Sequence, residues 1–127
     1  MSDMKAFSDL EQSRKLAEFL PLESADMYWW SSGKRYYIEA MDDGDFNEEE
    51  GHIRAWSLAA LINIIPQELF DGEYIINITE GIDNKWIITY DHYENRNHSF
   101  YGLSAGADNL VDACYEMIIK LHELNLL

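Results

Sequence analysis

The chain has 127 residues, is 47% hydrophobic, and carries a formal net charge of −15 from 24 acidic and nine lysine or arginine residues. The length suits one domain spanning residues 1–127, and the hydrophobic content excludes the disorder that so high a charge would otherwise indicate. A surface this negative repels phosphates and anionic lipid, so we expect no direct nucleic-acid or membrane partner, and a basic protein partner would be favoured.

The N-terminal third predicts a helix followed by a β-hairpin. Residues 8–20 have helical periodicity, Ser8 and Glu11 have the spacing of a capping box, and Pro21 ends the helix. Residues 27–30 and 35–41 are rich in aromatic or β-branched side chains and flank a turn around Gly33. We therefore expect two antiparallel strands there.

Residues 52–65, HIRAWSLAALINII, predict a central helix. Apolar side chains fall on nearly every side of such a helix, and a helix of that kind must be covered from several directions. The acidic run 42–51 precedes it as a loop. The last acids of that run, Glu48–Glu50, would then lie at the helix N-terminus, where the helix dipole favours negative charge.

The C-terminal half predicts three strands and a helix. Residues 73–80 and 85–93 alternate between two faces, and a shorter strand, 98–103, follows the turn at Asn95–Asn97. Residues 107–124 have apolar side chains at i, i+3, i+4 and i+7. The order αββαβββα predicts an α+β fold with one antiparallel sheet of about five strands, three helices, and the central buried helix 52–65.

Three stretches carry a resemblance to a known group: PLESADMYWW, HIRAWSLAALINIIP and DNLVDACYEMIIKLHELNLL. Together with the strands between them, they resemble small uncharacterised acidic proteins of gut Bacteroides-group bacteria, their phages and integrated elements. The resemblance covers most of the chain and implies an accessory protein of a phage or mobile element. It implies no activity and no site residues.

Catalytic and metal-binding patterns are weak. Six acids lie between Asp42 and Glu50, but the spacing of a calcium hand fails, because Glu48 falls where glycine is needed and Arg54 where the bidentate glutamate belongs. His92 and His98 flank a turn that could bring them close, without a zinc pattern around them. The single cysteine, Cys114, lies on the apolar stripe of the last helix. We expect no catalytic, cofactor or metal residues.

The aromatic side chains suggest a binding surface, because strand alternation cannot bury all of them. Tryptophan and tyrosine are enriched at protein interfaces. The residues expected on such an interaction surface are aromatic or acidic: Trp29, Trp30, Tyr37, Asp42, Asp43, Asp45, Tyr93 and Tyr101.

The preferred function is a non-enzymatic accessory protein acting through protein–protein contact, with a basic protein or a second copy of itself as partner, including a homodimer. One alternative is an acidic inhibitor that mimics nucleic acid toward a host factor. Another is a small metal-dependent hydrolase using the Asp42–Glu50 carboxylates. The N-terminus lacks the basic region and apolar run of a signal peptide, so we expect a cytoplasmic, soluble protein.

Overall fold

The computed structural model describes residues 5–41 and 44–127, with the backbone alone at residues 101 and 102. In this part of the chain, two antiparallel sheets and three helices make up the fold. The smaller sheet has the order β2-β1-β3, from β1 Met27–Ser31, β2 Tyr36–Ala40 and β3 Ile53–Ala55. The larger has the order β4-β5-β6-β7, from β4 Glu68–Leu69, β5 Tyr74–Glu80, β6 Trp86–His92 and β7 Ser99–Ala107. The helices are α1 Leu10–Ala17, α2 Leu58–Ile64 and α3 Leu110–Glu123, with short 3-10 turns at Leu22–Ser24, Glu48–Glu50 and Ile82–Asn84.

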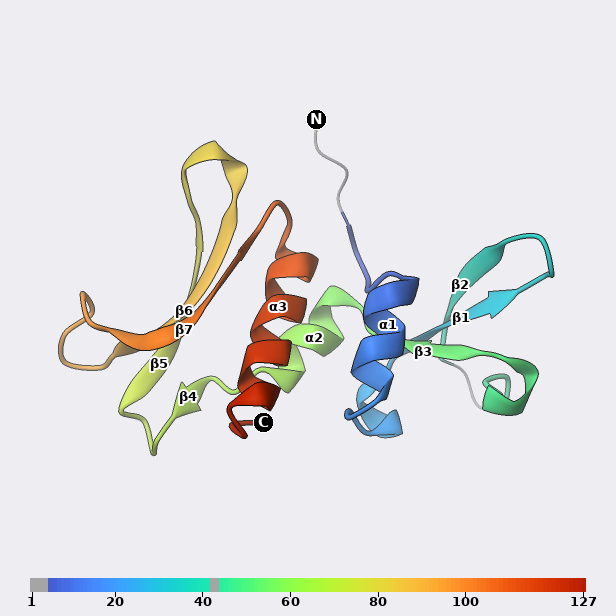
Figure 1. The fold of residues 1–127 in the computed structure, drawn as a ribbon, viewed down its shortest axis with the longest axis horizontal. Coiled ribbons are helices and arrows are strands. Elements are labelled where there is room, and N and C mark those ends of the chain that lie inside the picture. The colour runs from blue at the N-terminus through green and yellow to red at the C-terminus, as the bar shows by residue number, and fades with distance from the viewer. Residues whose placement is uncertain (1–4, 42–43) are drawn as a thin grey trace.

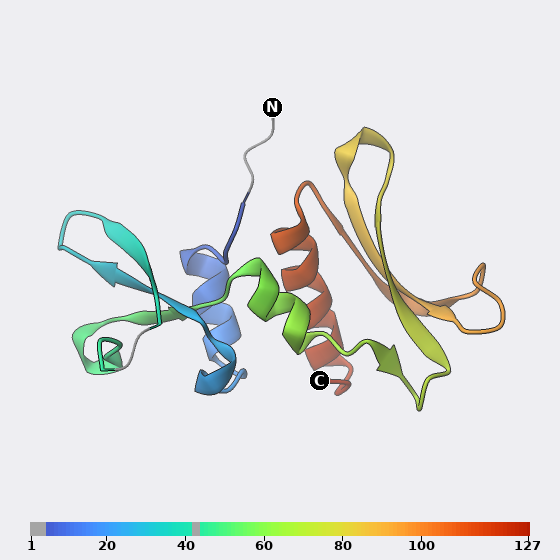
Figure 2. The same ribbon diagram turned by 180° about the vertical axis from the view of Figure 1, so that it is seen from behind.

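The α+β class is confirmed, and the two sheets and three helices lie in a row along the long axis of the molecule. The smaller sheet lies at one end against α1, the larger sheet lies at the other end against α3, and α2 lies between the two outer helices (Figures 1 and 2). Among the described residues, no helix is both long enough and apolar enough to cross a membrane.

The first helix is capped one residue later than predicted, and it ends at Ala17 rather than just before Pro21. Asp9, not Ser8, is the N-cap: its side chain accepts from the backbone N–H of Gln12, whose side chain accepts from the backbone N–H of Asp9. The predicted capping box of Ser8 and Glu11 is therefore wrong by one position. Ser8 is fully buried, and its hydroxyl accepts from the backbone N–H of Trp56 instead.

The predicted central helix 52–65 is wrong in its first half. Ile53–Ala55 is strand β3, which pairs with β1, and α2 begins only after the N-cap Ser57, whose hydroxyl accepts from the Ala60 N–H. The segment is apolar on all sides because a short strand and a short helix both bury part of it. Periodicity cannot distinguish these two states in a short apolar run.

The N-terminus of the central helix therefore does not carry the acidic run. Glu48–Glu50 form their own 3-10 turn, closed by Gly51 in the left-handed region at φ 86°. Two of these acids lie near a basic side chain: Glu48 accepts from the Arg54 guanidinium at 2.8 Å, and Glu50 Oε2 lies 3.8 Å from His52 Nε2. The helix-dipole role predicted for Glu48–Glu50 is a further error that follows from the misplaced helix start.

The strands of the C-terminal half are confirmed, with two differences. β5 and β6 pair in register from Tyr74↔His92 to Glu80↔Trp86. β7 is longer than predicted and ends at Ala107, so the last helix begins at Leu110 rather than at residue 107. The short strand β4 was not predicted. The structure thus has two sheets, of three and four strands, where one sheet of about five was expected.

The core lies between α3 and the larger sheet and extends to α1 and α2. The predicted apolar stripe of the last helix is buried from Val111 to Leu121, whereas Leu124 is 49% exposed. The same core contains side chains from β6, β7 and α2, together with Trp56. Its fully buried side chains include Trp56, Leu61, Ile88, Leu103, Val111, Cys114, Met117, Ile118 and Leu121. This central core leaves the two ends of the molecule as the places where aromatic side chains reach solvent.

Candidate functional site

The residues predicted to form an interaction surface lie in two separate regions. Trp29, Trp30 and Tyr37 belong to the smaller sheet, whereas Tyr93 follows β6 at the other end of the molecule. Asp45 is exposed in the loop before Glu48–Glu50. Asp42, Asp43 and the side chain of Tyr101 lie outside what the structure describes.

Trp29 is part of the packing between the small sheet and α1. Its indole N–H donates to the Ser8 carbonyl at 3.2 Å, and its ring meets Phe7 edge-on at 5.6 Å. Trp30 lies on the opposite face of β1, where it stacks on Tyr37 with ring centroids 4.7 Å apart. Strand alternation therefore places the two tryptophans on opposite faces of the hairpin, and both are partly buried.

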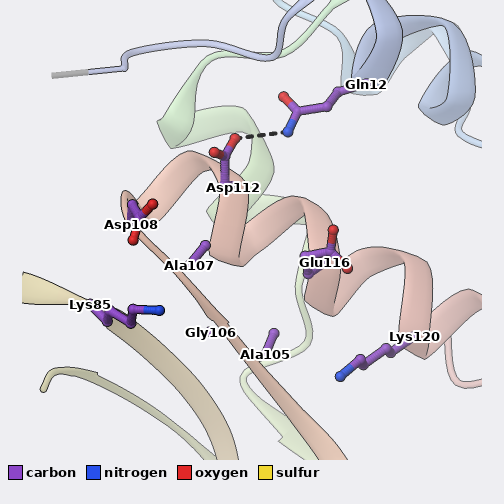
Figure 3. Close-up of a pocket in the computed structure, with 9 residues that line it drawn as sticks. All are labelled: Gln12, Lys85, Ala105, Gly106, Ala107, Asp108, Asp112, Glu116 and Lys120. Atoms are coloured by element: carbon purple, nitrogen blue, oxygen red, sulfur yellow. Dashed lines mark hydrogen bonds between the residues drawn. The ribbon is translucent and has the colours of Figure 1, made fainter. Parts of the chain in front are cut away.

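A polar groove lies between α3 and the free edge of β7 (Figure 3). It has a volume of about 460 Å³, and Ala105, Gly106 and Ala107 of β7 line it. Charges of both signs surround these small residues: Lys85, Lys120, Asp108, Asp112 and Glu116.

Three of the six polar side chains that line this groove have hydrogen-bond partners: Gln12, Asp112 and Lys120. Asp112 accepts from Gln12, Asn109 and Lys5, and Lys120 donates to the Ser104 carbonyl. These hydrogen bonds hold the pKa of the Asp112 carboxyl below its usual value, although its partial burial acts in the opposite direction. These bonds join α1 to α3, whereas within the described residues no side-chain hydrogen bond or ion pair includes Lys85, Asp108 or Glu116.

A second hollow, of about 600 Å³, lies at the end of the larger sheet. The β4–β5 turn forms one side and the segment after β6 forms the other, because Tyr74 and His92 are paired partners in the sheet. We call this feature the aromatic-acidic hollow, and define it by the residues that line it: Phe70, Asp71, Gly72, Glu73, His92, Tyr93 and Glu94.

Two half-exposed aromatic rings wall this hollow. Phe70 is 48% exposed and Tyr93 is 51% exposed, the largest exposed fractions among the aromatic side chains described. Phe70 packs against Phe100 with ring centroids 5.3 Å apart, and Tyr93 stacks on His92 at 5.0 Å. Each ring is therefore held from behind, while part of its face remains open to solvent.

The backbone of the β4–β5 turn is strained. Phe70, Asp71 and Gly72 have φ angles of 55°, 56° and 91°, all in the left-handed region. A bulky residue rarely adopts this conformation, which costs on the order of 1–3 kcal/mol. Glycine at the third position meets the requirement without that cost. The strain is consistent with a turn that fixes the direction of the Phe70 side chain.

The carboxylates of the hollow have no lysine or arginine partner. Asp71, Glu73 and Glu94 line it with no lysine or arginine among the lining side chains described. Within the described chain, the one ion-pair contact of these acids is between Glu73 Oε1 and His92 Nε2 at 3.9 Å, which requires a protonated imidazole. Glu94 accepts from the Tyr93 hydroxyl at 2.7 Å, and this bond raises the pKa of the phenol.

His92 is oriented by its neighbours. Its Nδ1 accepts from the Glu94 N–H at 3.2 Å, which places the proton of the neutral ring on Nε2, facing Glu73. His98 lies close to His92, with their ring centroids 6.3 Å apart, because the turn between the two residues brings them together. Within the described residues, no group of three histidine, cysteine or acidic side chains could hold a metal ion.

Comparisons with protein-family models, curated proteins and solved structures find no match to this chain. The candidate site therefore depends on geometry alone. Sequence reasoning selected Tyr93 but missed Phe70, Asp71, Glu73 and Glu94, because the acids are scattered among turns and nothing in the sequence shows that the two turns meet. The Asp71-Gly72 dipeptide was the one local signal of a turn there.

Proposed function

We propose that this protein is a non-enzymatic binding protein that contacts a basic segment of another protein through the aromatic-acidic hollow. The observation that carries the proposal is the combination of three carboxylates without a lysine or arginine partner and two half-exposed rings around one cavity. Carboxylates attract a cation, and an aromatic face within about 6 Å of that cation adds about 0.5–1 kcal/mol at an exposed site.

Arginine suits the hollow better than lysine does. Its planar guanidinium stacks on an aromatic face and donates two parallel hydrogen bonds to a carboxylate, whereas an ammonium is a compact and strongly hydrated point charge. The net charge of −15 favours the same partners, because it attracts basic segments from a distance. In this proposal the protein acts by binding to its partner, as an accessory protein of a phage or mobile element.

The test is a calorimetric titration with the blocked tripeptide acetyl-Gly-Arg-Gly-amide, with the lysine and glutamate analogues as comparisons. We expect the arginine peptide to bind most tightly, the lysine peptide less tightly, and the glutamate peptide to show no binding. Phe70→Ala and Tyr93→Ala should each weaken arginine binding by about 2- to 5-fold, as about 0.5–1 kcal/mol per ring implies.

The charge contribution needs a matched control. Glu73→Gln with Glu94→Gln removes two carboxylates of the hollow, whereas Glu23→Gln with Glu49→Gln removes two exposed carboxylates elsewhere. Both pairs change the net charge by the same amount. Binding should fall in the first pair and persist in the second. Equal loss in both pairs would show non-specific attraction to an acidic surface and would contradict the proposal.

A further inference from the structure

The turn of the first hairpin has the opposite charge to the hollow. It presents Lys34 and Arg35, both exposed, and Arg14 of α1 lies against the next residue, with its guanidinium 6.0 Å from the ring centroid of Tyr36. Three of the nine basic residues thus gather at one hairpin. In the described chain, no ion pair includes Arg14, Lys34 or Arg35.

The basic turn is held in place before any partner arrives. The Ser32 N–H donates to the Arg35 carbonyl at 3.1 Å, and the Gly33 N–H donates to the Ser31 hydroxyl at 3.0 Å. Gly33 has a φ of 95°, which the turn requires and which a residue with a side chain rarely adopts. A turn ordered in advance loses less conformational entropy on binding.

The aromatic residues beside the turn form a stacked series. The Arg35 guanidinium lies 5.3 Å from the ring centroid of Tyr37, which stacks on Trp30. The indole N–H of Trp30 is buried and has no hydrogen-bond partner among the residues that the structure describes.

The basic turn and the aromatic-acidic hollow lie at opposite ends of the long axis (Figure 1). One molecule therefore cannot bring its own turn to its own hollow. The geometry points to a second copy of this chain as the occupant: the turn Ser32–Arg35 of one molecule enters the hollow of the next, with Arg35 directed at Glu73 and Glu94 between the rings of Phe70 and Tyr93. This inference depends on the proposed function and names a partner for the same site.

The net charge opposes this contact at long range. Two molecules of −15 repel each other, whereas the local contact joins opposite charges at short distance. The Debye length falls from about 30 Å at 0.01 M salt to about 8 Å at 0.15 M, so moderate salt screens the general repulsion more than the close contact. Association should therefore be strongest at intermediate salt and weaken again near 1 M.

Complementation between two defective variants tests the contact. Lys34→Gln with Arg35→Gln removes the charge of the turn, and Glu73→Gln with Glu94→Gln removes charge from the hollow. We expect light scattering after size-exclusion chromatography at 0.15 M salt to show wild-type association that rises with concentration, and a monomer for each variant alone. An equimolar mixture should form a one-to-one pair, because one variant keeps the hollow and the other keeps the turn.

The control variant is Lys15→Gln with Lys85→Gln, which removes two exposed positive charges away from the turn and should associate like the wild type. A wild-type monomer at all concentrations and salt levels would overturn the inference, and so would a mixture that stays monomeric. The arginine tripeptide, titrated into the turn variant, separates the two proposals. Binding of the peptide without association of the chain would refute the second copy alone, whereas no binding would refute the proposed function as well.

Discussion

Ser8 and Trp56 are joined by two hydrogen bonds in the interior of the molecule. The Ser8 N–H donates to the Trp56 carbonyl at 2.8 Å, and the Trp56 N–H donates to the Ser8 hydroxyl at 3.0 Å. Both residues are fully buried, and the Ser8 hydroxyl also shares a hydrogen bond with that of Ser13. This pair connects the N-terminal segment to the point where the chain passes from β3 into α2.

Ser8→Ala should therefore lower the free energy of unfolding by about 1–3 kcal/mol, because it leaves the buried Trp56 N–H without an acceptor. Urea unfolding followed by tryptophan fluorescence measures the change. Ser32→Ala, in the exposed hairpin turn, is the control and should have an effect within about 0.5 kcal/mol. Equal effects of the two substitutions would contradict the role of the Ser8–Trp56 pair.

Adjacent residues of α2 allow a matched test of the core. Leu61 is fully buried, whereas Ile62 is 40% exposed on the next position of the same helix. Leu61→Ala should cost about 2–5 kcal/mol through lost burial and a cavity. Ile62→Ala should cost about 1 kcal/mol or less, because the site is already partly hydrated. Thermal or urea unfolding would separate the two, and similar losses would show that α2 is packed differently.

The contact between Lys5 and Asp112 should make stability depend on pH. Lys5 donates to Asp112 at 2.7 Å and to Asp9 at 2.9 Å. Partial burial lowers the pKa of the Lys5 ammonium, but the two hydrogen bonds outweigh this effect and raise the pKa above 10.5. Partial burial raises the pKa of the Asp112 carboxyl, but the hydrogen bonds that it accepts outweigh this effect and lower the pKa below 3.8.

The signs follow from proton linkage. The lowered pKa of Asp112 adds stability that is present above pH 3.8 and is lost as the pH falls through the pKa of the folded state. The raised pKa of Lys5 adds stability that is present below pH 10.5 and is lost as the pH rises through the pKa of the folded state. The difference in unfolding free energy between wild type and Lys5→Met should thus be largest at neutral pH and shrink at both extremes. Urea unfolding from pH 2.5 to 11 measures it, and a pH-independent difference would contradict the ion pair.

Cys114 should be unreactive in the folded protein. It is fully buried on the apolar face of α3, and desolvation raises the pKa of its thiol to about 12. The thiolate is the reacting form, so a disulfide reagent at pH 8 should label the native protein only as fast as it unfolds. Labelling in denaturant should be immediate. Rapid labelling without denaturant would show that α3 opens locally.

Salt should stabilise the fold. The excess of 15 negative charges causes self-repulsion that the folded state feels more than the extended chain does. Adding 0.1 M sodium chloride shortens the Debye length to about 10 Å and should raise Tm. Differential scanning fluorimetry measures this shift, and a Tm that falls on adding salt would contradict the account of the surface.

The sequence predicted those elements whose periodicity is long and regular. The α3 stripe and the alternation of β5 and β6 are both visible over many residues, and both are confirmed. The segment 52–65 failed because three residues of β3 and seven of α2 are each too short to show a period. Its strand pairing depends on a contact between Ile53 and Trp29, which are distant in sequence.

The candidate site was less predictable than the fold. Trp30 and Tyr37 stack across the hairpin, as paired strands allow, but Tyr93 belongs to a different surface. Phe70 is placed in the hollow by three successive residues with positive φ, and a sequence shows that conformation only where glycine occupies the position. The pairing of β5 with β6 then determines which acids meet.

The placement of a basic turn at one end and an acidic hollow at the other determines how an assembly would grow. A contact of this kind is not symmetric, so each pair keeps one unused turn and one unused hollow, and every addition creates the same contact as the last. No particular length is favoured unless the chain closes into a ring. Average length would then rise gradually with protein concentration, and a single molecule lacking either end would stop growth at the position where it binds.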